Sequence, residues 1–520
     1  MRPPCDEAVI RSGDARSPCA AEARTWILAA TIIGTSMAFI DSTVVNVALP
    51  ALQTSFHATV VGVQWVVESY GLFLGALILV GGSLGDLFGR RLMFTLGVAI
   101  FAVASLSCGL ASNIDQLIIA RSIQGVGAAL LVPGSLAIIS TSFDEKSRGQ
   151  AIGTWSGFTA ITTAVGPVLG GWLVEHASWR WVFFINLPLA AATIAISLWQ
   201  IPESRSAAEG HVDWLGALIV TFGLGGLVIG FIESVNLGWA HPLVLAGLIG
   251  GCICLVLFLF VEPTLSSPMV PLTLFASSTF SGTNLLTLFL YAAIGIFFFL
   301  FPLNLIQVQG YSATTAGAAM LPLILLIFFL SRWSGGLVAR YGARPPLTIG
   351  PLVVALGFIL FAVPSVGGGS YWIIFFPAVI VLGFGMAITV APLTTIVMNS
   401  VGQERVGAAS GINNAVARVA GVLAIAVLGI VMVKAFSSRL NQSLVSLALP
   451  PGVVEMVQSN EIELAGLQLP GGLDADTRAF LTASIAEAFI SGFRKVMLIC
   501  VGLSVASAVV TRIMIPENTN

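Results

Sequence analysis

Two acidic residues and one arginine lie inside segments that are otherwise apolar. Asp41 belongs to the stretch AFIDSTVVNVALP in the run that begins at Trp26, and Glu68 and Arg121 lie in two later runs. Counting about 1.5 Å of rise per residue puts all three roughly 8–9 Å below one surface of a ~30 Å hydrocarbon core. A charge at bilayer depth costs about 2.5–3.5 kcal/mol on insertion scales. A carboxyl group can exchange a proton, whereas arginine stays charged, so this layer suits proton transfer.

The composition identifies the class of protein that would hold such a layer. The chain has 520 residues, of which 57% are hydrophobic and only 9% are charged, and its mean hydropathy is +0.98. Soluble domains carry about 25% charged residues, so we expect an all-α polytopic membrane protein in a lipid bilayer. The net charge of −2 offers no basic surface for nucleic acid, and the six scattered cysteines show no metal or disulfide spacing.

About fourteen apolar runs are long enough to cross a bilayer, which takes roughly 20 residues. They lie at about 26–49, 62–81, 92–111, 116–139, 149–175, 181–200, 213–232, 242–261, 279–303, 314–333, 346–364, 371–397, 406–433 and 491–514. Lysines and arginines gather in the loops of one side, so the positive-inside rule places both termini in the cytoplasm. The long segment between the last two runs is then extracellular, and its mixed composition predicts a partly helical flap.

The chain contains an internal repeat. The loop GSLGDLFGRRLMF, which begins at Gly82, matches GGLVARYGARPPL, which begins at Gly335, and two downstream matches include Gly125 with Gly383. Near-constant offsets at three places predict two six-helix bundles of the same orientation with two extra helices between them. The predicted regions are a cytoplasmic tail at 1–25, the first bundle at 26–200, the extra helices and linkers at 201–278, and the second bundle at 279–515 with an extracellular loop at about 434–490.

Four motifs carry a family resemblance. They are IDSTVVNVALP in the first span, GSLGDLFGRR in the next loop, LIIARSIQGVGAA in the fourth span and AVGPVLGGWL in the fifth. Together they resemble the major facilitator superfamily, specifically its fourteen-helix drug:proton antiporter branch, and the resemblance runs from about Trp26 to Arg512. The chain departs from the family pattern at Leu87, where the loop motif normally has arginine, and at Ala339, where the second copy of the loop lacks its acid.

The resemblance implies roles for the buried charges. In the family's fold the first and fourth helices line a central cavity, so Asp41 and Arg121 would face each other across it, with Glu68 in the same layer. Our hypothesis is that these residues couple transport to protons: Asp41 takes up a proton from outside and releases it inside, and Arg121 tunes its pKa. The alternative is a static ion pair that fixes helix packing.

Two glycine-containing motifs are predicted to act in the conformational change. The resemblance makes the loop motif a cytoplasmic latch between the halves, with Asp86 at a neighbouring helix N-terminus; the alternative is a topology anchor. The fifth-span motif would be a hinge or leak seal, and the alternative is ordinary close packing. The gate residues are Gly82, Gly85, Asp86, Gly89, Arg90 and Arg91, and the antiporter-motif residues are Gly157, Gly166, Pro167, Gly170 and Gly171.

Amides near a phenylalanine cluster suit an amphipathic cargo, and the alternative is lipid-facing aromatics with an interfacial amide end. By helical rise Arg418 lies about 18 Å from the inside, which predicts a gate or cavity partner. The predicted substrate-cavity residues are Asn46, Gln124, Phe298, Asn304, Gln307 and Arg418.

Together these features predict proton-driven efflux of amphipathic small molecules, of the multidrug or antiseptic type, by alternating access across the bacterial cytoplasmic (inner) membrane. The alternative is an exporter of the same fold for one endogenous metabolite, lipid, siderophore or antibiotic. No G-x-x-x-x-G-K-S/T loop appears and the four histidines lack ligand spacing, so we expect neither an enzyme nor an ATP-driven pump, and no metal site. We expect no cofactor beyond the coupling proton, and a chain that functions as a monomer.

Overall fold

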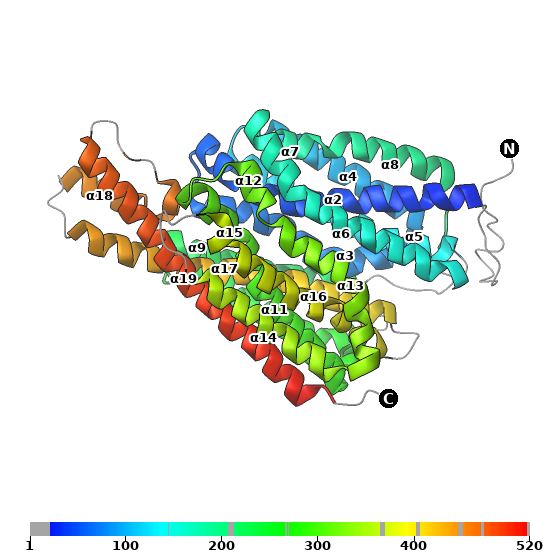
Figure 1. Cartoon of the computed structure of the whole chain (residues 1–520). Helices are drawn as coiled ribbons and strands as arrows, with labels where there is room; N and C mark the ends of the chain where they lie inside the picture. Colours follow the sequence, from blue (N-terminus) through cyan, green and yellow to red (C-terminus); the bar gives the residue numbers. More distant parts are fainter. Residues whose placement is uncertain are drawn as a thin grey trace.

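The computed structural model describes residues 21–516 apart from 144, 206–212, 266–267, 269, 364–369, 402–405, 446–450, 468 and 470–472. Within these residues the regular elements are all helices, and fourteen helical segments are long and apolar enough to cross a membrane, as predicted. The predicted tail at 1–25 lies mostly outside the described residues. We call the end where α2 (Ala21–Phe56) begins and α19 (Ala475–Met514) ends the terminal end, and the opposite end, marked by α18 (Pro451–Ser459), the flap end (Figure 1).

The first half of the chain forms one bundle. Polar side chains cap its helices where the apolar runs begin: Thr59 Oγ1 accepts a hydrogen bond from the Gly62 amide at 3.2 Å, and Asn113 Oδ1 accepts one from the Gln116 amide at 2.9 Å. The helices that follow α2 are α3 (Val60–Phe88), α4 (Arg90–Leu110), α5 (Ile114–Ser142), α6 (Glu145–His176), α7 (Trp181–Phe184) and α8 (Asn186–Gln200).

The second half forms a similar bundle. Its elements before α19 are α11 (Ser278–Leu303), the π-helix η3 (Asn304–Val308), α12 (Ala313–Ala318), α13 (Leu321–Tyr341), α14 (Arg344–Phe361), α15 (Tyr371–Ile374), α16 (Phe376–Asn399), α17 (Val406–Val445), α18 and η5 (Glu461–Gly466). The segment predicted to be a partly helical extracellular loop, about 434–490, contains the end of α17, which runs on to Val445, and the start of α19 at Ala475. Hydropathy marks where a helix leaves lipid, and a helix with polar residues can continue beyond that point.

The internal repeat has a structural counterpart. Gly89 ends α3 with φ 121° and Gly342 ends α13 with φ 80°, a left-handed backbone that glycine adopts without strain. Gly125 and Gly383 lie equally close to neighbouring helices: an added Cβ would be 2.6 Å from the Tyr70 carbonyl oxygen in one case and 2.9 Å from Leu323 Cα in the other. The matched glycines therefore make the same turns and close approaches in both bundles.

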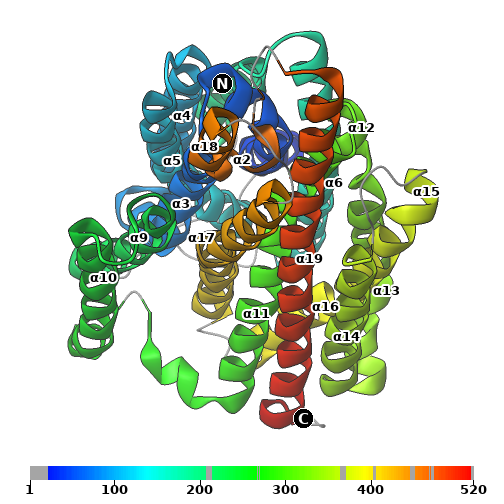
Figure 2. The ribbon, with the colours of Figure 1, turned by 90° about the vertical axis from the view of Figure 1, so that its left-hand side faces the viewer.

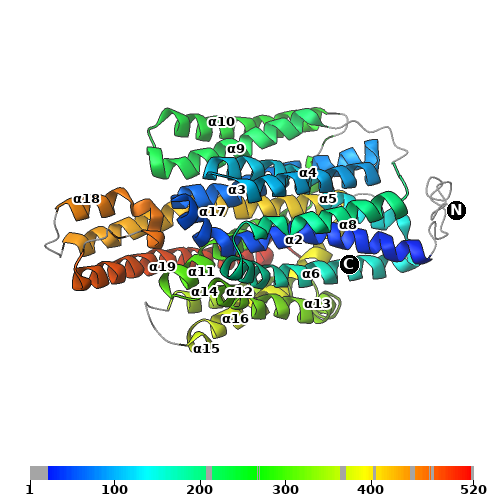
Figure 3. The ribbon, with the colours of Figure 1, turned by 90° about the horizontal axis from the view of Figure 1, so that it is seen from above.

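The two extra helices lie beside the seam between the bundles. α9 (Trp214–Leu237) packs on both α3 and α17, and α10 (Pro242–Val261) lies outside α9 (Figures 2 and 3). Leu224, Val228 and Ile232 of α9 form one apolar cluster with side chains of α3 and α17. α9 thus covers the line where the two bundles meet.

The bundles lie together at the flap end and diverge toward the terminal end (Figure 1). The 3-10 helices η1 (Glu262–Thr264) and η2 (Leu272–Ala276) lie between α10 and α11, in the segment that leads from the extra helices to the second bundle. The seam is therefore closed at one end in this conformation.

Candidate functional site

The Asp41 and Arg121 side chains form an ion pair in the core of the first bundle. The pair joins α2 to α5, and the side chains are only 0% and 1% exposed. The depth count had put both residues in one layer, and the family resemblance had implied that they face each other. Because both partners are removed from water, the pair is far stronger electrostatically than one at a protein surface.

Amides and a hydroxyl complete the surroundings of Asp41. Its Oδ1 accepts hydrogen bonds from Gln124 Nε2 at 2.9 Å and from Asn186 Nδ2 at 3.3 Å. Both amide nitrogens also lie within hydrogen-bonding distance of Ser105 Oγ, at 2.8 and 2.9 Å. The network therefore links α2, α4, α5 and α8. Gln124, which had been predicted to line the substrate cavity, contacts both members of the ion pair in this conformation.

Sequence reasoning missed Ser105 and Asn186. Asn186 carried a usable signal, because it is a lone amide in the apolar stretch WVFFINLP. Ser105 carried none, since serine is common in membrane helices and only the packing of α4 on α5 shows its partner.

Arg121 is held on its other sides as well. Its Nε donates to the Val66 carbonyl oxygen at 3.1 Å, its Nη1 donates to Gln124 Oε1 at 2.7 Å, and its guanidinium carbon lies 4.2 Å from the centre of the Tyr70 ring. The Tyr70 hydroxyl in turn donates to the Ala38 carbonyl oxygen at 3.2 Å. In this conformation the Asp41 carboxyl group is therefore bonded on all sides by Arg121, Gln124 and Asn186.

Glu68 does not join this network. Its side chain is completely buried, and neither carboxyl oxygen has a hydrogen-bond partner among the described residues. Residues two positions apart on a helix point in roughly opposite directions, so Glu68 leaves α3 on the side away from Val66 and Tyr70. The predicted layer of three charges is thus split: depth was counted correctly, but direction around the helix was not considered.

The loop motif at the terminal end binds within its own bundle. Asp86 pairs with Arg90 at 2.8 Å, one turn away, and Glu203 accepts hydrogen bonds from the amides of Arg91 and Leu92 at 3.1 and 3.2 Å. The start of α4 is therefore occupied by Glu203, and Asp86 lies on its own arginine instead of on a helix N-terminus of the other half. The latch between halves stays a prediction for another conformation.

Glycines of α6 allow close packing on both sides. A Cβ at Gly166 would lie 2.1 Å from Thr43 Oγ1, and one at Gly170 would lie 2.2 Å from a Val44 methyl carbon, so these two glycines seat α6 on α2. Gly171 faces the second bundle, where an added Cβ would lie 2.2 Å from the Ala313 carbonyl oxygen. Gly157 has no such neighbour, since the nearest atom would be 3.8 Å away.

The contact between α6 and α12 is reciprocal. A Cβ at Gly317 of α12 would lie 2.1 Å from the Pro167 carbonyl oxygen of α6. Glu175 adds a polar link, because its Oε2 accepts a hydrogen bond from the Thr314 hydroxyl at 2.6 Å. The antiporter-motif segment therefore forms part of the closed seam at the flap end.

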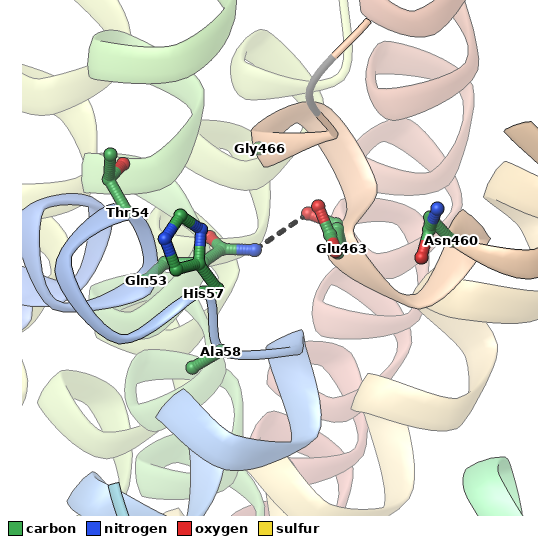
Figure 4. A pocket seen from close by; sticks show the side chains of 7 residues that line it. All are labelled: Gln53, Thr54, His57, Ala58, Asn460, Glu463 and Gly466. Atoms are coloured by element: carbon green, nitrogen blue, oxygen red, sulfur yellow. Dashed lines mark hydrogen bonds between the residues drawn. The ribbon is translucent and has the colours of Figure 1, made fainter. Parts of the chain in front are cut away.

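A chain of amides adds to this closure. Gln307 of η3 donates to Gln53 Oε1 of α2 at 2.9 Å, and Gln53 Nε2 donates to the Glu463 carbonyl oxygen of η5 at 2.9 Å. The same turn of α2 lines a small pocket with His57 and Asn460 (Figure 4). In this conformation Gln307 therefore bonds across the seam to the first bundle, and its place in a substrate cavity stays a prediction.

The other predicted cavity residues are dispersed. Asn46 donates to the Ser42 carbonyl oxygen of its own helix at 3.1 Å, and Asn304 is buried at the start of η3. Phe298 lies against Phe297, whose ring belongs to a buried aromatic cluster inside the second bundle. These side chains do not form one site here.

Arg418 is the predicted cavity residue that lies on the seam. Its guanidinium carbon lies 5.9 Å from the centre of the Phe39 ring of α2, and its Cβ lies opposite Gly75 of α3. It therefore places a cation of the second bundle beside the first bundle.

Two repeated bundles of membrane helices, closed together at one end, with an ion pair buried in one of them, define a polytopic membrane protein of the transporter class. A sequence model of the Major Facilitator Superfamily matches residues 31–218 and again residues 213–425. The chain belongs to this superfamily, which confirms the family predicted from its motifs.

Curated relatives cover most of the chain. It is 34% identical over 418 residues to the multidrug resistance protein Stp of Mycobacterium tuberculosis, covering 80% of this chain and 77% of that one. It is 33% identical over 430 residues to the tetracenomycin C resistance and export protein of Streptomyces glaucescens, covering 81% and 78%. The methylenomycin A resistance protein of Bacillus subtilis is 31% identical over 409 residues, covering 78% and 87%.

Solved structures share the fold. A bacterial homologue of the human lysosomal transporter Spinster, in an inward-facing and unoccupied conformation, superposes with a TM-score of 0.66 at 18% identity, covering 96% of this chain and 99% of that one. The POT family transporter PepTSo gives a TM-score of 0.63 at 13% identity, covering 96% and 98%. These matches confirm the predicted all-α fold.

Proposed function

We propose that this protein exports amphipathic small molecules across the bacterial cytoplasmic membrane by proton-driven alternating access. The relatives named for drug resistance and export support the direction and the class of cargo. The distribution of arginine and lysine supports cytoplasmic termini, which makes the flap end the outer end. The structure would then be closed to the outside.

The observation that carries this proposal is the buried Asp41–Arg121 pair. An ionisable pair at membrane depth marks ion and substrate pathways in transport proteins. Asp41 accepts bonds from three side chains and is closed to water here. Its exchange of a proton therefore belongs to a conformation in which the bundles have moved and water reaches α2.

The remaining predicted partners follow from this proposal. The chain would need no cofactor beyond the proton and would work as a monomer in the lipid bilayer. Arg418 and Phe39 offer a cation and a ring at the seam, where a cargo could touch both bundles.

The test is transport by the purified protein in liposomes. A panel of cationic, neutral and anionic amphipathic compounds is followed with an imposed pH gradient and with an uncoupler. We expect uphill movement of several compounds, lost with the uncoupler and lost in Asp41→Asn. Asp115→Asn is the matched control, because Asp115 is an exposed acid at the start of α5. Uphill transport by Asp41→Asn equal to that of the unaltered protein would refute the role of Asp41.

The same panel separates the alternative function. An exporter of one endogenous metabolite, lipid, siderophore or antibiotic would move none of the unrelated compounds uphill, although the fold and the ion pair would be unchanged.

A further inference from the structure

Glu68 lies at the meeting line of three helices. The register of α3 against α17 follows from two contacts: an added Cβ at Gly71 would lie 2.9 Å from a Val422 methyl carbon, and one at Gly75 would lie 3.5 Å from Arg418 Cβ. The two helices are antiparallel, so this register places Glu68 opposite Ile425. Both halves of the protein thus meet at this carboxyl group.

Apart from Gln64, a buried amide one turn back along α3 that lies against Gly429 of α17, the surroundings of Glu68 are apolar. Leu72, one turn along α3, and Val61, two turns back, belong to the same cluster as Val228 of α9 and Ala426 of α17. Glu68 is 0% exposed, and both its oxygens lack a hydrogen-bond partner among the described residues. A carboxylate buried in this way is strongly disfavoured, whereas a neutral carboxylic acid is tolerated.

Charged groups near Glu68 on each packed helix are otherwise engaged or point away. On α9, Glu233 accepts a hydrogen bond from Trp65 Nε1 at 2.8 Å. On α17, Arg418 lies two turns toward the terminal end and faces Phe39, and Lys434 lies over the Trp239 ring near the flap end. On α2 and α5, Asp41 and Arg121 bind each other on the opposite side of α3. None of these groups forms an ion pair with Glu68 in the described part of the chain.

We propose that Glu68 is a second proton site, and that the seam between α3 and α17 closes at the flap end only when this carboxylate has taken up a proton. While the seam is open, water reaches Glu68 and the group is a carboxylate. Addition of one proton from that water gives the neutral acid, which can then be buried against α17. Acidic pH on the flap side therefore favours the closed conformation.

This inference rests on the proposed alternating access, but it separates the two acids. In the closed conformation a carboxylate at Asp41 is stabilised by a cation and amide donors, whereas a carboxylate at Glu68 has neither and is disfavoured. The two acids therefore hold protons in different parts of the cycle, and the proton that accompanies closure is on Glu68.

The experiment measures closure directly and needs no cargo. Spin labels at Ser112 and Ser370, exposed positions at the flap end of the first and second bundles, report their separation by double electron–electron resonance. The background keeps only the buried Cys108 and Cys500. In nanodiscs between pH 5 and 9 we expect the short-distance population to grow as pH falls. Glu68→Gln should remain closed throughout, with its closed-to-open ratio at pH 8 raised at least tenfold.

Two further variants make the result specific. Glu233→Gln removes an acid from the same seam and should keep the original pH profile, and Glu68→Leu should stay closed as Glu68→Gln does. A Glu68→Gln profile that follows pH like the unaltered protein, or an unaltered protein whose distances ignore pH, would overturn the inference. The liposome assay is independent: absence of any cargo flux would refute the proposed efflux without changing these distances.

Discussion

Removing one partner of the Asp41–Arg121 pair should destabilise the protein more than removing both. In Arg121→Gln the Asp41 carboxylate stays buried and loses its cation, keeping amide donors at 2.9 and 3.3 Å. Breaking a buried pair by deleting one partner costs about 3–5 kcal/mol, because an uncompensated charge remains. Asp41→Asn leaves the Arg121 cation with only neutral neighbours, among them Val66, Tyr70 and Gln124, and should cost a similar amount. The double variant leaves no buried charge, so we expect most of the loss to be recovered.

Thermal unfolding in detergent, followed by tryptophan fluorescence, measures this cycle on the two single variants and the double variant. We expect the double variant to melt close to the unaltered protein and both single variants to melt well below it. Ser105→Ala serves as a reference for loss of a neutral partner, which should cost about 0.5–1.5 kcal/mol per hydrogen bond. Losses in the double variant equal to the sum of the single losses would show that the two charges do not interact, and the site described above would be wrong.

Three other predictions test separate parts of the fold. Gly171→Val should prevent closure at the flap end and abolish transport, because a Cβ there would lie 2.2 Å from a backbone carbonyl of α12, whereas Gly157→Ala should be active; spin-label distances and flux measure both. Glu203→Ala should free the first amides of α4 and speed their hydrogen exchange, with the helix elsewhere unchanged. The pKa of Asp474 is lowered by the hydrogen bond from the Thr477 amide, so the cap of α19 is present above the ordinary pKa of an aspartate and is lost as pH falls through the lowered value. Hydrogen-exchange protection at the start of α19 should therefore drop in acid, and Asp474→Asn should remove this pH dependence.

Hydropathy predicted the spans well because lipid contact imposes the same apolar requirement on every crossing helix. It could not predict where α17 ends and α19 begins, since these turns lie beyond the lipid; the end of α17, for example, is held by a hydrogen bond from Asn441 to Glu461 of η5 at 2.6 Å. The repeat was visible because two structural requirements select glycine at matching positions. Close helix approach requires it at Gly125 and Gly383, and a turn with positive φ requires it at Gly89 and Gly342.

The charged site was predicted in part. The family resemblance predicted that Asp41 and Arg121 face each other, and the structure pairs them. Depth counting put both residues in one layer. It placed Glu68 with them wrongly, since depth along a helix says nothing about direction around it. The contact of Gln307 could not be predicted for a different reason: its partner Gln53 belongs to the other bundle, and no local pattern encodes how two bundles close.

The glycine and amide contacts that close the flap end cannot by themselves make closure depend on pH. Gly171 and Gly317 meet backbone carbonyl oxygens, and Gln53 joins Gln307 to a backbone oxygen of η5, so none of these contacts changes charge with pH. Glu175 does cross the seam to Thr314, but it is exposed, and an exposed carboxylate stays charged across the physiological range. A closure made of such contacts would be indifferent to the proton gradient. A buried carboxyl group on the same seam changes that, because its proton must be in place before the two bundles can meet.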